Sequence, residues 1–410
     1  MNIHKTVVIL LALLLAGMAM VPMVSAAESK LSSPSKMVNT DEASSVALIN
    51  VQDIANSAPG FSEWHDSEVI LSKMYFDLTG NPAAYAFNVT QNGDYLGYIL
   101  ISAQRDNYPV LECSRGHLPT ASTDFVSRSK TKISESQTKD LVIQNPVPVY
   151  LGATFYYDAY PMTDKTGNVV DYAYVDLTNS RLFNSEDMKK EMAINKSSLK
   201  ANVAKPVDIE RLWSLESSPS VMASVSSMTR SSNYIYDVPY YAWYRGCSPT
   251  AAAMVLGYWQ SHGYPNYPTA NTLIDELGNA MGTSSTWPFT GATFPLFIDD
   301  GIETVAANHG YSGLNSVENI WFSSDHFTDM AAEIDAGRPF VLSMYAGGAA
   351  LGKPDTYDEH SVTVVGYVGS LQNYLTIHDT WNSPPNYPLN DYRLLANMNW
   401  GGSMSDWVRP

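Results

Sequence analysis

The feature that most constrains the fold is a serine-rich stretch that divides the chain. Residues 217–233 carry eight serines in the run SSPSVMASVSSMTRSSN, without a hydrophobic periodicity. Such a segment cannot build a core and is typical of a surface linker or a processing site. In a chain of 410 residues it predicts two folded parts, residues 27–216 and 234–410, joined by a linker over residues 217–233.

The composition limits the classes of partner and cofactor. Asp and Glu number 41 against 24 Lys and Arg, and the net charge is -17, so nucleic acid is not expected as the main partner. Hydrophobic residues make up 45% of the chain, which is enough to form cores. The two cysteines, Cys113 and Cys247, exclude a disulfide-stapled scaffold and a Cys-only zinc site. We expect neither a metal nor a cofactor.

The first 26 residues have the pattern of a signal peptide. Lys5 supplies the positive charge, and an apolar stretch of about 14 residues follows it, shorter than the roughly 20 of a membrane span. Val24-Ser25-Ala26 fits the small-x-small cleavage pattern. We expect a secreted or cell-surface protein without a membrane span after signal removal, with a retained anchor as the alternative.

The part before the linker is predicted to be α+β, and it carries no constellation of catalytic residue types. Hydrophobic spacing and turn residues predict the following elements: a helix over 46–55, a hairpin of 84–90 and 95–102 turning at Asn92-Gly93, a second strand pair of 154–160 and 169–177, and a charged surface helix over 185–199.

The segment around Cys247 predicts a reactive thiol at the start of a helix. Gly246 permits a tight turn, Pro249 suits a first helical turn, and Ser248 and Thr250 can cap free amides. Strong helix formers follow up to residue 259. The positive end of a helix favours the thiolate, and its free N–H groups can stabilise an oxyanion.

A cysteine nucleophile needs a base and a group that orients the base. His360 opens the β-branched run SVTVVGY, and Asp379 ends the run YLTIHD after a turn near residues 369–373. If the two runs pair as an antiparallel hairpin, residues 361–363 face Asp379 and the two groups lie at the same end. Cys247, His360 and Asp379 are the predicted catalytic residues.

These three segments resemble papain-fold cysteine peptidases, specifically the bacteriocin-processing (double-glycine peptidase) type, over roughly residues 234–382. The resemblance implies a helix that bears Cys247, packed on an antiparallel sheet that carries His360 and Asp379. Before the linker, GYILISA over 97–103 and the residues up to 111 are similar to the propeptide of streptopain-type peptidases. Together, the two resemblances imply an exported cysteine endopeptidase-like hydrolase of peptides or proteins, made as a zymogen with an intramolecular propeptide.

The chain departs from this family at the oxyanion hole. The family has a glutamine several residues before the cysteine, whereas no glutamine lies between Val238 and Cys247. Tyr241, six residues before Cys247, is the predicted substitute donor, and the Trp243 indole is an alternative. Loss of one such donor costs about a hundredfold or more in rate.

Other interpretations of the same residues remain open. Cys247 could be a buried structural cysteine or pair with Cys113, which is expected to be buried core. Asp358 and Asn382 are rivals to Asp379, and His378 should face away from His360 by strand alternation. The run GGAALGK at 347–353 resembles a phosphate loop, but Pro354 lacks the hydroxyl that such a loop needs.

Two other functions fit the sequence. The missing glutamine and the aromatic residues before Cys247 fit an inactive peptidase fold that acts as a cell-surface binding module. An acyl transferase would use the same triad with an amine in place of water.

Overall fold

The structure is a computed structural model of the whole chain. It describes the following residues: 37–119, 127, 131, 141–152, 156–177, 182–186, 188, 209–216, 231–285, 291–321, 327–345, 359–380, 392–396 and 403–410. The predicted signal peptide, nearly all of the predicted helix over 185–199, and linker residues 217–230 lie outside these ranges.

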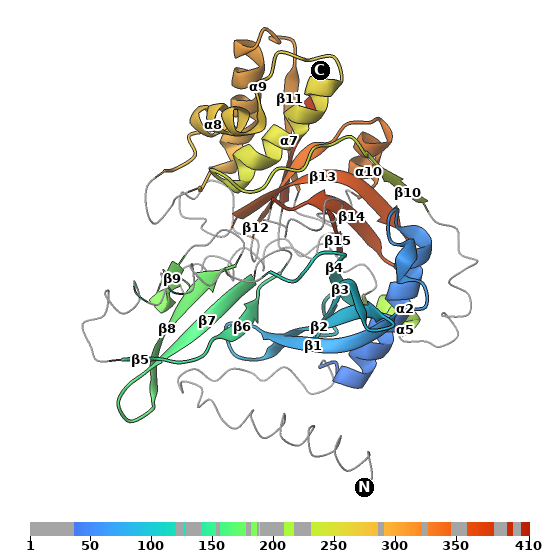
Figure 1. Cartoon of the computed structure of the whole chain (residues 1–410), viewed down its shortest axis with the longest axis vertical. Helices are drawn as coiled ribbons and strands as arrows, with labels where there is room; N and C mark the ends of the chain where they lie inside the picture. The colour runs from blue at the N-terminus through green and yellow to red at the C-terminus, as the bar shows by residue number, and fades with distance from the viewer. Residues whose placement is uncertain are drawn as a thin grey trace.

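The chain forms one mixed α+β fold in which a continuous sheet crosses both predicted parts (Figure 1). The strands are β1 (Glu68–Phe76), β2 (Pro82–Gln91), β3 (Asp94–Ser102), β4 (Val110–Ser114), β5 (Val142–Ile143), β6 (Val147–Tyr150), β7 (Tyr156–Thr163), β8 (Val169–Asp176), β9 (Leu182–Asn184), β10 (Ser231–Tyr234), β11 (Asn315–Trp321), β12 (Phe340–Tyr345), β13 (Glu359–Gly369), β14 (Asn373–His378), β15 (Tyr392–Ala396) and β16 (Ser403–Arg409). Their order is β11-β16-β12-β13-β14-β15-β4-β3-β2-β1-β6-β7-β8-β9, with β10 on β13 and β5 on β7.

Most of the helices lie in two groups (Figure 1). They are α2 (Thr40–Ser57), α5 (Ile209–Glu216), α7 (Cys247–Ser261), α8 (Ala270–Ala280), α9 (Ile298–Asn308) and α10 (Phe327–Asp335), with short 3-10 turns η2 (Ser62–Trp64) and η4 (Pro295–Phe297). Helices α7, α8 and α9 gather at one end of the molecule, whereas α2 and α5 lie beside β1–β4.

The predicted elements before the linker are confirmed where the structure describes them. The predicted helix over 46–55 is the middle of α2, and the two predicted strand pairs are β2–β3 and β7–β8. Asn92 and Gly93 have φ of 53° and 89°, the left-handed pair that a two-residue hairpin turn requires.

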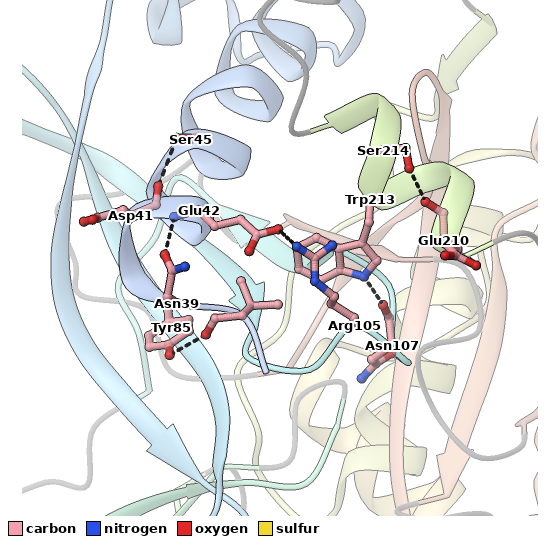
Figure 2. A network of polar contacts seen from close by, with 11 residues as sticks. Asn39, Asp41, Glu42, Ser45, Tyr85, Arg105, Asn107, Glu210, Trp213 and Ser214 are labelled. Atoms are coloured by element: carbon pink, nitrogen blue, oxygen red, sulfur yellow. Dashed lines mark hydrogen bonds and ion pairs between the residues drawn. The ribbon is translucent and has the colours of Figure 1, made fainter. Parts of the chain in front are cut away.

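Helix α5, directly before the linker, is fixed to α2 and the segment after β3 (Figure 2). The Trp213 indole N–H donates to the Asn107 carbonyl at 3.0 Å, and the Arg105 guanidinium lies over the Trp213 ring and pairs with Glu42 of α2. Trp213 is buried. The chain therefore reaches residue 216 while still attached to the N-terminal half.

On the other side of the linker the chain is attached to the C-terminal half. Ser231, Ser232 and Asn233, which the sequence analysis placed in the linker, pair with Val368 and its neighbours as β10. The described chain thus passes from one half to the other between residues 216 and 231. The division into residues 27–216, 217–233 and 234–410 as separate domains and linker remains a prediction.

The two halves share sheet and core, which the prediction of two parts joined by a linker did not include. Strand β4 of the N-terminal half pairs with β15 of the C-terminal half, with Cys113 opposite Leu394. One apolar cluster combines Tyr157 and Phe183 of the N-terminal half with Val362 and Val364 of β13. Within the described residues, no helix has the length and apolarity needed to cross a membrane.

Candidate functional site

Cys247 is the first residue of helix α7, as predicted, and is 8% exposed. Gly246 before it has an extended backbone, and a Cβ on it would lie 2.6 Å from the Gly291 carbonyl oxygen. Such a contact is too short for any side chain, so Gly246 is required by close packing. Neither cysteine forms a disulfide, and Cys113 is fully buried, as predicted.

The hydroxyl groups of the first turn of α7 do not cap free amides. The Thr250 hydroxyl donates to the Gly246 carbonyl at 2.6 Å, within the turn itself. The Ser248 hydroxyl turns to the sheet instead and lies 2.8 Å from the Ser361 hydroxyl of β13. The Thr250 N–H donates to the Gly246 carbonyl at 3.2 Å, and Pro249 has no N–H. The N–H groups of this turn without an acceptor inside the helix are therefore those of Cys247 and Ser248.

A chain of three buried hydroxyls joins α7 to two strands. Ser361 contacts Ser248 at 2.8 Å and Ser343 of β12 at 2.9 Å. Two residues further along β13, the Thr363 hydroxyl donates to the Ala251 carbonyl of α7 at 2.9 Å. All of these side chains are at most 1% exposed.

This contact brings together the chain segments that carry the two predicted catalytic residues. Cys247 directly precedes Ser248, and His360 directly precedes Ser361. His360 is the second residue of β13 and is therefore at the end of that strand. The sequence analysis missed Ser343 and Ser361 and gave Ser248 a capping role instead of this contact. The signal for Ser248 and Ser361 is that they directly follow the predicted nucleophile and base.

The predicted hairpin is confirmed. Strands β13 and β14 pair antiparallel with Thr363 opposite His378, so Asp379 follows opposite the start of β13. The His360 Nε2 atom lies 3.0 Å from the Asp379 carbonyl oxygen. Since a carbonyl only accepts, Nε2 carries the proton in this contact.

The contact between His360 and Asp379 differs from the predicted one. The imidazole bonds to the main-chain carbonyl of Asp379, whereas the prediction used the carboxylate. The carboxylate accepts a hydrogen bond from the Tyr240 hydroxyl at 3.3 Å. The sequence analysis used Tyr240 only as one of the aromatic residues before Cys247 that fit a binding module, and it did not predict the contact with Asp379.

Burial controls the protonation of His360. Desolvation lowers the pKa of His360 to about 4, while the nearby Asp176 carboxylate and the hydrogen bond to Asp379 act in the opposite direction. Asp176 ends β8 of the N-terminal half and is 2% exposed. The ring is therefore neutral at pH 7 in the full chain.

The prediction that Tyr241 donates to an oxyanion is wrong. A Cβ on Gly257 would lie 2.7 Å from the Tyr241 hydroxyl, so this hydroxyl packs on the middle of α7. Gly257 is ten residues after Cys247, about 15 Å along a helix. Tyr241 is partly buried and packs against the apolar cluster that includes Val255 and Leu256 of α7. Trp243, the alternative, packs on Gly291, which in turn contacts Gly246.

The remaining candidates lie elsewhere. The buried His378 ring contacts the Tyr234 hydroxyl at 3.4 Å and lies beside Tyr240. His262 stacks on Tyr258, and His309 bonds to Glu276. The alternatives Asp358, Asn382 and the run 347–353 lie outside the described residues. No group of ligands that could hold a metal ion occurs in the part of the chain that the structure describes.

Comparison with known proteins gives one family. Residues 235–400 match the model of the Peptidase_C39 like family. No curated protein matches the chain. Among solved structures, a fragment of prointerpain A from Prevotella intermedia aligns with 84% of this chain and 98% of its own length, at 13% identity and a TM-score of 0.37.

The hydroxyl chain gives a first prediction. Ser361→Ala should lower the free energy of unfolding by about 2 kcal/mol, because it leaves two buried hydroxyls without their partner. Ser343→Ala is the matched control: it removes one contact, keeps the Ser248–Ser361 pair, and should cost about half as much. Urea unfolding measures both values. Equal losses of unfolding free energy in the two variants would show that the Ser248–Ser361 contact does not stabilise the fold.

The buried histidines give a second prediction. Desolvation also lowers the pKa of His378 to about 4. Both rings titrate near 6.5 in the unfolded chain. Their contribution to the free energy of unfolding is therefore fully present above pH 6.5 and is lost as the pH falls from 6.5 to about 4. Each ring accounts for up to about 3 kcal/mol of this loss.

Urea unfolding between pH 7 and pH 4 measures this effect. His360→Gln and His378→Gln should each make the stability less dependent on pH in this window. His262→Gln, at an exposed ring, should leave the dependence unchanged. Identical pH profiles for the wild type and both buried-site variants would contradict the assigned burial.

Proposed function

We propose, from the match of residues 235–400 to the Peptidase_C39 like family, that the chain is an exported cysteine peptidase made as a zymogen. Cys247 is the nucleophile, His360 the general base, and Asp379 the residue that orients the imidazole. The observation that carries this assignment is the 2.8 Å contact between Ser248 and Ser361, which brings the start of α7 to the start of β13.

The proposed reaction is hydrolysis of a peptide bond in two steps. The Cys247 thiol attacks the scissile carbonyl, a sulfur–carbon bond forms, and the thiol proton passes to the imidazole. His360 returns this proton to the leaving amine as the carbon–nitrogen bond breaks. Water then hydrolyses the thioester, with the imidazole again taking and returning one proton.

The remaining parts of the reaction centre also have candidates. The oxyanion faces backbone N–H groups at the start of α7, which lack partners within the helix. Asp379 orients the imidazole through its main-chain carbonyl, and Tyr240 holds its carboxylate. Removal of the Asp379 carboxylate should therefore cost less than removal of His360.

Three observations support the zymogen proposal. Tyr157 and Phe183 of the N-terminal half pack in one cluster with Val362 and Val364 of β13, two and four residues after His360. Asp176 of that half lies close enough to His360 to affect its pKa. Helix α5 and strand β10 hold the two ends of the linker on different halves. Cleavage between them would remove the covalent connection and allow the N-terminal half to dissociate from the strand that carries the base.

Replacement of the nucleophile tests the peptidase proposal. Cys247→Ala should reduce hydrolysis of a denatured protein substrate under reducing conditions by at least about a thousandfold. Cys113→Ala, at a buried cysteine of the shared core, is the control and should retain activity if it folds.

The alternatives predict other outcomes of this experiment. An inactive binding module would give no hydrolysis with either variant and no reaction of Cys247 with a thiol-directed peptidyl inhibitor. An acyl transferase would release product only when an acceptor amine is present. Either result would contradict the proposed hydrolase.

A cut in the linker tests the zymogen proposal. A site-specific protease sequence placed within residues 224–229 allows the chain to be cut at will. Cutting should raise the hydrolysis rate, because loss of the N-terminal half reduces the burial of His360 and its pKa moves up toward 6.5. Size-exclusion chromatography follows the separation of the halves, and the same chain with Cys247→Ala is the control. An unchanged or lower rate after separation would contradict an inhibitory N-terminal half.

A further inference from the structure

Thr380, the residue after Asp379, has a backbone conformation that its side chain disfavours. Its φ is 65°, in the left-handed region, and it is fully buried. Glycine and asparagine adopt this region readily, whereas a β-branched residue is strained there. Among the described residues with side chains, only Asp66 and Asn92 share a positive φ, and both are of types that tolerate it.

The φ of Thr380 sets the directions of two carbonyl groups. Rotation about this bond turns the Asp379–Thr380 peptide relative to the Thr380 carbonyl. The Asp379 carbonyl accepts from His360 Nε2 at 3.0 Å. The Thr380 carbonyl accepts from the Trp243 backbone N–H at 2.7 Å. A negative φ at residue 380 would turn one of the two acceptors away from its donor.

The Thr380 hydroxyl takes no part in this arrangement. Its Oγ1 atom is buried and has no hydrogen-bond partner in the described structure. A buried hydroxyl without a partner is unfavourable. Thr380 thus combines a strained backbone with a hydroxyl that makes no hydrogen bond. Its role in the structure therefore lies in the direction of its backbone.

The bond to Trp243 connects two segments that both reach the reaction centre. Trp243 lies four residues before Cys247, and its ring packs on Gly291, which contacts Gly246. Three residues earlier, Tyr240 bonds to the Asp379 carboxylate. The loop that leads to the nucleophile is therefore tied at two points to the segment that orients the base.

We propose that Thr380 is a positioning residue: its left-handed backbone, held by the Trp243 N–H, fixes the Asp379 carbonyl that orients His360 relative to the loop before Cys247. The inference rests on the proposed function, because it assigns a role relative to that reaction centre. It acts through His360 and needs no contact between Thr380 and the substrate.

A matched pair of variants tests the bond to Trp243. Trp243→Ala and Trp243→Pro both remove the indole, but only proline also removes the N–H that donates to Thr380. The readout is the tautomer of the His360 ring in the full chain, measured by nitrogen-15 NMR and assigned with His360→Gln. The wild type should hold the Nε2–H form, Trp243→Ala should keep it, and Trp243→Pro should give a mixture of tautomers.

Residue 380 is tested in the same way. Thr380→Gly accepts the positive φ without strain and should keep the Nε2–H form. Thr380→Pro fixes φ near −65° and should lose it. If Thr380→Pro does not fold, the Trp243 pair still decides. After cutting at the linker, Trp243→Pro should also lower kcat by about 100-fold relative to Trp243→Ala, with a smaller change in KM, because the base is misplaced by about 1 Å.

Equal tautomer populations in Trp243→Pro and Trp243→Ala would overturn the inference, as would a wild-type ring in the Nδ1–H form. The tautomer readout does not depend on hydrolysis. A chain without peptidase activity that still showed the tautomer change would overturn the proposed function and support the positioning role.

Discussion

The hydroxyl contact between Ser248 and Ser361 is the interaction on which the arrangement of the site depends. It joins the first turn of the helix that begins at Cys247 to Ser361, the residue that follows His360 in β13. Because the pair is buried and shared with Ser343, breaking it leaves polar groups without water or partner. The spacing between the two segments is therefore fixed by satisfied hydrogen bonds as well as by apolar packing.

Strand β13 also connects the site to both halves of the chain. Ser361 and Thr363 face α7, whereas Val362 and Val364 pack in the cluster that includes Tyr157 and Phe183 of the N-terminal half. His360, near the start of the same strand, lies close enough to Asp176 of the N-terminal half for that carboxylate to affect its pKa. Burial by the N-terminal half and the low pKa of His360 are thus consequences of one packing arrangement.

Much of the fold and part of the site could be predicted from the sequence. Periodicity and turn residues identified α2, the β2–β3 hairpin, the start of α7 at Cys247 and the β13–β14 hairpin, because these are local patterns. The pairing of β4 with β15 joins residues far apart in the chain, and no local pattern encodes it. The contact of His360 with a main-chain carbonyl depends on the left-handed turn at Thr380, which threonine does not suggest. Tyr241 was misassigned because sequence distance from Cys247 does not tell which way a side chain points.

The rate of alkylation of Cys247 as a function of pH, measured by mass spectrometry on the chain cut at the linker, tests the central claim most directly. If the imidazole of His360 shares the thiol proton, the rate should change little between pH 5 and pH 8. In His360→Gln it should rise by about tenfold per pH unit, as for an ordinary thiol. Coincident profiles for the two proteins would contradict the account, because the sulfur would then be reacting without the histidine.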